Sequence, residues 1–104
     1  MADRQGQTDG AVKERVEIKR QDPTPYAVVL LNDDYTPMQF VVDILESLFD
    51  KMPAEAHRIM MQVHLNGRGV AGVYPWELAE TKAEKVASLA SSAGHPLRAT
   101  VEEV

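Results

Sequence analysis

Apolar positions along the chain fall into short blocks whose spacing predicts alternating strands and helices. Residues 26–31 (YAVVLL) form a continuous apolar run, and its length and composition indicate a buried strand. Over residues 36–49 apolar side chains recur every three or four positions, which predicts an amphipathic helix. Thr36 is a suitable N-cap, Pro37 suits the first helical position, and Gln39 would complete a capping box with Thr36.

Proline and glycine mark the element boundaries in the second half of the chain. A second helix is predicted from Pro53 to a C-terminal cap at Gly67, followed by a strand over residues 70–74. A third helix is predicted from Pro75 to Gly94. Its inward-facing apolar positions are predicted to be Leu78, Val86, Leu89 and Ala90.

The fold class follows from the order of these elements. Residues 97–101 alternate apolar and polar side chains after a proline, which predicts a last strand. The complete order is β-α-α-β-α-β. Three short strands pair most simply as an antiparallel sheet, with the three helices packed on one face, so the sequence predicts a small α+β domain.

Composition divides the chain into a tail and one domain. A length of 104 residues suits a single small domain. Residues 1–25 are polar with balanced charges and few large apolar side chains, which predicts a disordered N-terminal tail. The net charge of −5 therefore lies in the predicted core domain, residues 26–104.

The same composition excludes several classes of protein. Without cysteine the chain forms neither disulfides nor zinc–thiolate sites, which fits a reducing cytosol. An acidic net charge argues against a general nucleic-acid binder. No apolar run approaches the roughly 20 residues that span a bilayer, and the N-terminal pattern is not that of a signal or transit peptide.

Polar side chains gather between the first strand and the first helix. Asn32, Asp33 and Asp34 offer oxygen acceptors that suit a cation held by hydrogen bonds. Taken alone, this triplet is also typical of a turn and helix cap. His64, near the end of a helix, is by itself typical of a dipole partner, and Met38 of a filler in an irregular core.

Taken together, several segments resemble the ClpS family of adaptors. The main segment is residues 30–38 (LLNDDYTPM). Further segments follow in the family's order and spacing, namely Phe40-Val41, Val63-His64 with Gly67, residues 72–74 (GVY), residues 79–82 (AETK) and residues 95–97 (HPL). The resemblance covers about 75 residues of the chain, from Tyr26 to near its end, and leaves out the tail.

This resemblance implies a binding function and no catalysis. Family members bind proteins whose first residue is Phe, Tyr, Trp or Leu, and deliver them to the ClpA unfoldase for degradation by ClpP. The α-amino group would be held by Asn32, Asp33, Asp34 and His64. The first side chain would enter a pocket in which Met38 acts as a gate against β-branched residues, and whose implied lining is Leu30, Leu31, Thr36, Met38, Val41, Met60, Val63 and Leu97.

The resemblance also implies partners and a location. Glu77 and Lys82 on the third helix would dock to the N-terminal domain of ClpA. The protein would act in the bacterial cytoplasm, without a cofactor or metal. The sequence shows no evident apolar surface stripe, which favours a monomer. The N-terminal tail would take part in substrate delivery, although its sequence does not match the family.

Three other interpretations of the same residues remain open. His64 with Asp33 or Asp34 could serve as a general-base pair, although no nucleophilic motif or cofactor loop accompanies it. The same three residues could hold a metal, although a single histidine without fixed ligand spacing is a weak signal. The domain could also be a docking module of related fold that does not recognise N-terminal residues.

Overall fold

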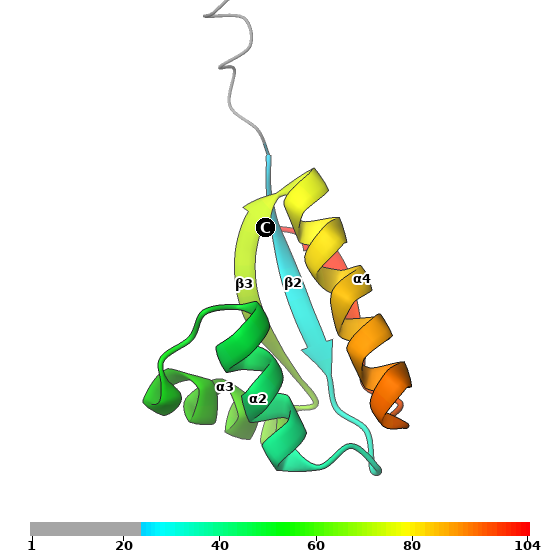
Figure 1. The fold of residues 1–104 in the computed structure, drawn as a ribbon. Helices are drawn as coiled ribbons and strands as arrows, with labels where there is room; N and C mark the ends of the chain where they lie inside the picture. Colours follow the sequence, from blue (N-terminus) through cyan, green and yellow to red (C-terminus); the bar gives the residue numbers. More distant parts are fainter. Residues whose placement is uncertain (1–23) are drawn as a thin grey trace, which may run out of the picture.

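The computed structural model describes residues 24–104, which form six elements in the predicted order (Figure 1). These elements are β2 (Pro25–Leu31), α2 (Met38–Leu48), α3 (Pro53–Asn66), β3 (Arg68–Pro75), α4 (Trp76–Ala93) and β4 (Arg98–Glu103). The predicted tail, residues 1–25, lies outside the described residues except for its last two positions. No helix of the described part is both long and apolar enough to cross a membrane.

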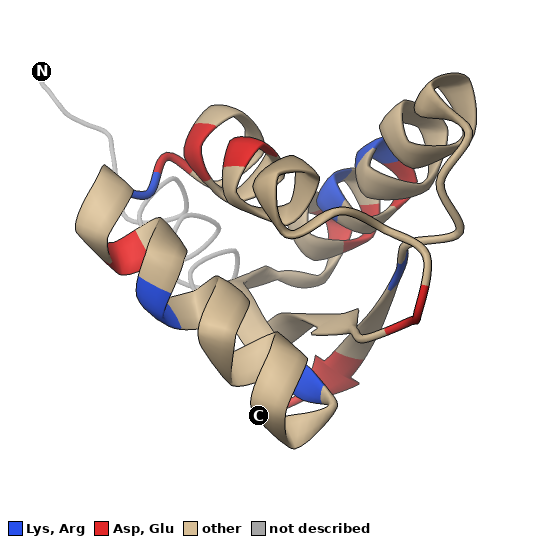
Figure 2. Cartoon of the chain, turned by 90° about the horizontal axis from the view of Figure 1, so that it is seen from below, with Lys and Arg blue, Asp and Glu red and all other residues tan. Residues whose placement is uncertain are grey.

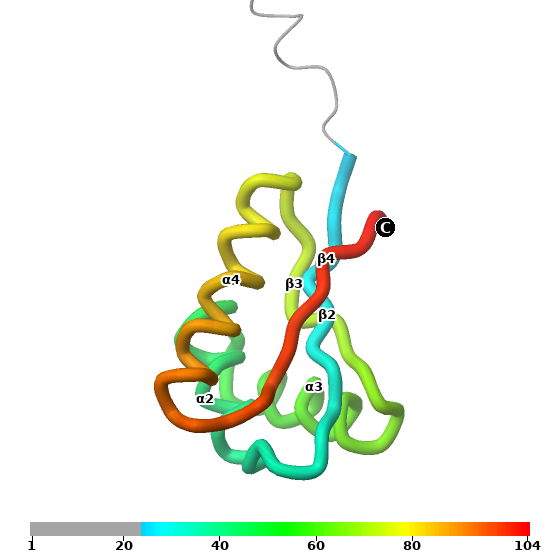
Figure 3. The backbone as a smooth tube through the Cα atoms, turned by 90° about the vertical axis from the view of Figure 1, so that its right-hand side faces the viewer, coloured from blue at the N-terminus to red at the C-terminus, as the bar shows by residue number. Residues whose placement is uncertain are grey.

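The three strands form one antiparallel sheet in the order β3-β2-β4. β2 is the central strand, so neighbouring strands pair with its backbone on both sides. All three helices lie on one face of this sheet, as Figure 3 shows from the side. The predicted α+β architecture is therefore confirmed. One irregularity interrupts the pairing of β2 with β3, between Val28 and Val29, where Ala71 is the extra residue on β3.

The hydrophobic core lies between this face of the sheet and the helices. Val28 and Leu30 point into it from β2, and their neighbours on that strand, Ala27 and Val29, are buried on the opposite face. The helices contribute buried side chains at the predicted helical spacing. The largest fully buried residues are Leu30, Leu45, Ile59, Val28, Val29 and Val86.

Both predicted glycine caps are confirmed. Gly67 ends α3 with φ 90° and Gly94 ends α4 with φ 79°, in the left-handed region that favours glycine. The N–H of Gly67 donates to the carbonyl of Val63 at 2.9 Å, and the carbonyl of Gly67 accepts from the N–H of Asn32 at 2.9 Å. The end of α3 is thereby tied to the end of β2.

Two predictions about the helices are wrong. Pro37, and not Thr36, is the N-cap of α2, and no side chain caps this helix. The hydroxyl of Thr36 donates to Asp33 instead, and Gln39 donates to Asp43 one turn along the helix. A capping box is therefore absent from the start of α2.

The predicted inward face of α4 is also partly wrong. Val86 and Ala90 are buried, but Leu78 and Leu89 are each 45% exposed. Ala79, which was not predicted to face inward, is fully buried. The helix therefore packs on the sheet mainly through small side chains, which allow a close approach, while its leucines lie at the flanks.

Lys82 joins α4 to the end of α2. Its ammonium group donates to the carbonyl of Leu48 at 2.7 Å, in the last turn of α2, where that helix has no basic residue of its own. The same group lies 5.9 Å from the ring centroid of Phe49 and 5.6 Å from that of Tyr74. A cation at a helix C-terminus and over aromatic faces is stabilising, so Lys82 is a structural residue of the fold.

Replacing Lys82 should therefore destabilise the domain. Lys82→Met keeps much of the aliphatic chain but leaves the Leu48 carbonyl without its donor, which should lower the free energy of unfolding by about 1–2 kcal/mol. Urea denaturation would measure the change. Lys85→Met is the matched control, because Lys85 is exposed on the same helix and should change stability by less than about 0.5 kcal/mol. Equal effects of the two variants would contradict the structural role of Lys82.

Candidate functional site

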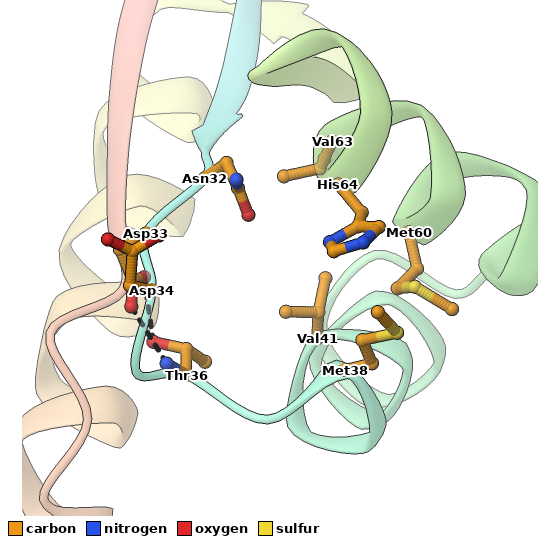
Figure 4. Close-up of a pocket in the computed structure, with 9 residues that line it drawn as sticks. All are labelled: Asn32, Asp33, Asp34, Thr36, Met38, Val41, Met60, Val63 and His64. Atoms are coloured by element: carbon orange, nitrogen blue, oxygen red, sulfur yellow. Dashed lines mark hydrogen bonds between the residues drawn. The ribbon is translucent and has the colours of Figure 1, made fainter.

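A pocket of about 240 Å³ opens between the β2–α2 loop, α2 and α3 (Figure 4). It brings together residues more than 25 positions apart in the chain. Its lining consists of Asn32, Asp33, Asp34, Thr36, Met38, Val41, Met60, Val63 and His64. All four residues predicted to hold an α-amino group, and five of the eight predicted pocket residues, therefore line one cavity.

The polar side of the pocket is built by the loop and the end of α3. Asn32 and Asp34 are exposed, and His64 lies in the last turn of α3. Figure 4 shows Asn32 pointing into the space between the loop and His64. The hydrogen bond from the N–H of Asn32 to the carbonyl of Gly67 fixes this arrangement, because it fastens the loop to the end of the helix that carries His64.

Asp33 differs from its neighbour, because its carboxylate is used within the loop. One oxygen accepts from the N–H of Tyr35 at 2.8 Å and from the N–H of Thr36 at 2.7 Å. The other accepts from the hydroxyl of Thr36 at 2.8 Å. Partial burial alone would raise the pKa of Asp33, but the bonds from Thr36 and Tyr35 and the nearby His95 hold this pKa below its ordinary value.

The opposite side of the pocket is apolar. Val41 from α2 and Met60 and Val63 from α3 are buried, with exposed fractions of 6%, 4% and 2%. Met38, in the first turn of α2, is 44% exposed. In Figure 4 the side chains of Met38 and Met60 lie near one another at the end of the pocket farthest from Asp33. Met38 is therefore a partly exposed, unbranched side chain at the rim.

Three residues predicted for the pocket do not line it. Leu30 and Leu97 belong to the buried core, with exposed fractions of 0% and 3%. Leu31, the last residue of β2, is half-buried. These leucines support the pocket through the core and the sheet, and are not part of its surface.

One residue that the sequence did not assign to the site is His95. Its ring packs edge-on against Phe40 of α2, with ring centroids 4.7 Å apart, and its charge acts on Asp33. The loop before β4 therefore supports the back of the Asn32–Asp34 turn. No local pattern around His95 could have indicated this contact, because it depends on the packing of α4 beside α2.

The two residues predicted to dock a partner have different environments. Glu77 is exposed in the first turn of α4, where a carboxylate is also favoured by the helix dipole. Lys82 is half-buried and directed at Leu48. Only Glu77 presents its charged group fully to solvent.

The chemistry of the pocket is that of hydrogen-bond acceptors beside an apolar wall. An amide oxygen, a free carboxylate and an imidazole suit an ammonium group, and the thioether and valine side chains suit an apolar group attached to it. Within residues 24–104 no cluster of three or more His, Cys, Asp or Glu side chains could hold a metal ion. The arrangement is therefore suited to binding a small amphipathic cation.

Comparison with known proteins agrees with this description. The family model described as "ATP-dependent Clp protease adaptor protein ClpS" matches residues 21–100. A protein named "ATP-dependent Clp protease adapter protein ClpS" from Herminiimonas arsenicoxydans is 52% identical over 96 residues, which are 92% of this chain and 94% of that protein. The protein of that name from Paraburkholderia xenovorans (strain LB400) is 52% identical over 95 residues, 91% of each chain.

A solved structure is similar over most of the same region. It is "The structure of Agrobacterium tumefaciens ClpS2 bound to L-phenylalaninamide", which has a TM-score of 0.76 and 41% sequence identity. The match covers 79% of this chain and 99% of that one. The family match over residues 21–100 and the relatives at about 50% identity, which extend over nine-tenths of the chain, lead to one conclusion: the protein belongs to the ClpS family of ATP-dependent Clp protease adaptors.

Proposed function

We propose that this adaptor binds the free α-amino group and the large hydrophobic first side chain of N-degron substrates, and delivers them to a ClpA-type unfoldase for degradation by ClpP. The first side chain would be Phe, Tyr, Trp or Leu. The protein itself would carry out no chemistry, and would act as a monomer in the bacterial cytoplasm. The observation that carries the proposal is the pocket in which polar acceptors and an apolar wall adjoin.

The polar side would recognise the α-ammonium group. Among residues 24–104 no side-chain group donates to the side chains of Asn32 or Asp34, so both can accept hydrogen bonds from a ligand, and a neutral His64 can accept another. Acetylation removes the charge and two donors of an N-terminus, so these acceptors would lose their partners on binding. A buried acceptor left unpaired costs about 1–3 kcal/mol, which is a sufficient source of discrimination. Asp33 would act indirectly, by holding the turn that presents Asn32 and Asp34.

The apolar side would select the first side chain. Burial of a Leu or aromatic side chain against Val41, Met60 and Val63 contributes about 1.5–3 kcal/mol. Unbranched Met38 and Met60 can adjust to side chains of different shape. L-phenylalaninamide, the molecule bound to the ClpS2 relative, has both a free α-amino group and a benzyl side chain, which supports this assignment.

Delivery would use the exposed start of α4. Glu77 is the residue best placed to meet the N-terminal domain of the unfoldase directly, because its carboxylate faces solvent. Lys82 would contribute mainly by holding α4 against the end of α2. The role of the N-terminal tail in delivery stays a prediction.

Peptide binding tests both halves of the site. Fluorescence anisotropy should detect binding of a labelled peptide that begins with free Phe, and little or no binding when the same peptide is acetylated or begins with Ile. Asp34→Asn removes a charge at nearly constant shape, and should weaken Phe-peptide binding about tenfold or more. Glu84→Gln, on the exposed side of α4, is the matched control and should leave affinity unchanged.

The outcomes of this experiment separate the proposal from the docking-module interpretation. If all three peptides bind equally, or if none binds, the protein does not recognise N-terminal residues. The docking-module interpretation would then be favoured, with α4 as the candidate docking surface. If Asp34→Asn binds the free Phe peptide with unchanged affinity and still rejects the other two, the protein recognises N-terminal residues but Asp34 does not hold the ammonium group.

The gate can be tested at Met38. Met38→Ala opens the rim of the pocket and should admit first residues branched at Cβ, so the preference for Phe over Ile should fall by about tenfold or more. Affinities for free Phe and free Ile peptides would be compared in both proteins. Met52→Ala, at an exposed methionine before α3, is the control. If Ile peptides still fail to bind the Met38 variant, another residue excludes them.

Ionisation of Asp33 should make the stability of the domain depend on pH in acidic solution. A carboxylate with a lowered pKa stabilises the fold fully above its ordinary value of 3.8, and this contribution is lost as pH falls through the lower native value. Asp33→Asn should therefore cost about 1 kcal/mol at neutral pH, allowing for solvent exposure, and nothing in stronger acid. Urea denaturation at several pH values would measure the free energy of unfolding of each variant relative to the unchanged protein. This difference should shrink in acid for Asp33→Asn and should not depend on pH for the control, Glu84→Gln. A constant difference for Asp33→Asn would contradict the assignment.

A further inference from the structure

A second hollow, of about 440 Å³, lies between α3 and β3. From α3 it is lined by side chains that include Arg58, Ile59 and Gln62. These residues occupy a different face of the helix from Met60, Val63 and His64, which line the first pocket. We call this second hollow, bounded by residues 51–62 and 68–73, the edge groove.

The other wall of the edge groove is an edge strand. Within residues 24–104, β3 pairs with β2 alone, so the backbone groups along its other side have no partner strand. Figure 1 shows β3 at the left edge of the sheet, with β2 to its right. Val70 and Val73 line the groove and are 45% and 50% exposed. An extended segment added here would gain backbone hydrogen bonds and cover these valines.

The backbone of β3 is also accessible at its glycines. Gly69 and Gly72 both line the groove. Gly69 allows α3 to pack closely, because a Cβ atom there would lie 2.8 Å from a methyl group of Val63. Glycine within a strand is typical of places where another backbone approaches closely. The groove therefore combines a narrow end, closed by α3, with an open strand edge.

Charge indicates what kind of segment would fit. The described residues carry a net charge of −5, and acidic positions lie on all three helices (Figure 2). The groove is nevertheless lined by Lys51, Arg58 and Arg68 and by only one acidic residue, Glu55. Arg58 pairs with Glu55 at 2.5 Å, and Arg68 with Glu102. Because these pairs are exposed they contribute little to stability, so the arginines can exchange them for carboxylates of a ligand.

We propose that the edge groove binds an extended, acidic peptide segment that adds to β3 as a further strand. Its alternate apolar side chains would cover Val70 and Val73, and its carboxylates would pair with Arg58 and Arg68. Because the two hollows use different faces of α3, this site would be separate from the first pocket and does not depend on the function proposed for it. Recognition of the segment would not require a free N-terminus.

The probe is a fluorescein-labelled, N-acetylated peptide of alternating Val and Glu, about as long as β3, added to the full chain. Acetylation keeps it from offering an ammonium group to the first pocket. Anisotropy should show saturable binding that weakens with added salt. The double variant Arg58→Gln/Arg68→Gln should weaken binding by about tenfold, since each exposed pair contributes a few-fold. Lys85→Gln, which removes a charge from α4, should not change it.

Two comparison peptides separate strand addition from charge attraction alone. Replacing every Glu by Lys should abolish binding, and replacing the central Val by Pro, which removes a backbone donor, should weaken it strongly. Equal binding of the Pro peptide, or equal loss in Lys85→Gln, would overturn the proposal. If circular dichroism shows that the Arg58→Gln/Arg68→Gln variant is unfolded, the Arg58→Lys/Arg68→Lys variant is used instead. That variant keeps both charges and should bind the Val-Glu peptide, so its failure to bind would also overturn the proposal. Sedimentation showing dimers that the Val-Glu peptide does not dissociate would assign the edge to a second copy of the chain and also overturn it.

Discussion

A left-handed turn at Gly67 holds the Asn32–His64 pocket together. Its positive φ ends α3 and directs the chain into β3, while its carbonyl accepts the N–H of Asn32. Nothing lies within 4 Å of a Cβ atom built there, so the need for glycine is one of backbone conformation and not of space. A residue with a side chain would cost about 1–2 kcal/mol in this conformation. Because one hydrogen bond joins this turn to the β2–α2 loop, the relative position of Asn32 and His64 depends on it.

The polar groups of the loop have two kinds of environment, one hydrogen-bonded within the loop and one exposed at the pocket. Asp33 accepts three hydrogen bonds from the two residues that follow, which fixes the turn and leaves little capacity for a ligand. Asp34, next in sequence, is exposed at the pocket. Of the two adjacent carboxylates, Asp33 thus holds the turn and Asp34 faces the pocket. The lowered pKa of Asp33 keeps its carboxylate ionised further into acid than an ordinary aspartate.

Much of the fold could be predicted from the sequence because proline and glycine marked its boundaries and the apolar spacing marked its elements. Gly67 and Gly94 are where the caps were expected. Features that depend on contacts between residues distant in the sequence could not be predicted. The charged spacing of α4 did not indicate that Lys82 reaches a carbonyl 34 residues away. Nor could helical periodicity show that α4 packs through Ala79 and leaves its leucines at the flanks.

For the pocket, the sequence supplied the residue types and the family resemblance supplied their association, since Asn32 and His64 are far apart in the chain. The residue types alone could not separate Asp33 from Asp34, because both precede the same helix and are distinguished by the hydrogen bonds of Asp33. The resemblance placed Leu30 and Leu97 in the pocket, whereas both belong to the buried core, because apolar residues beside a site are equally suited to a wall or to the core behind it.

The two sides of the pocket differ in stiffness, and this difference suits the proposed function. The polar side is fixed by backbone hydrogen bonds at Asn32 and by the Asp33 turn, so a bound ammonium group would have one position. The apolar side ends in Met38 and Met60, unbranched side chains with several rotatable bonds, one of them 44% exposed. A strict requirement for the charge can therefore coexist with tolerance of Phe, Tyr, Trp and Leu, because the charge meets the rigid side and the variable group meets the adjustable one.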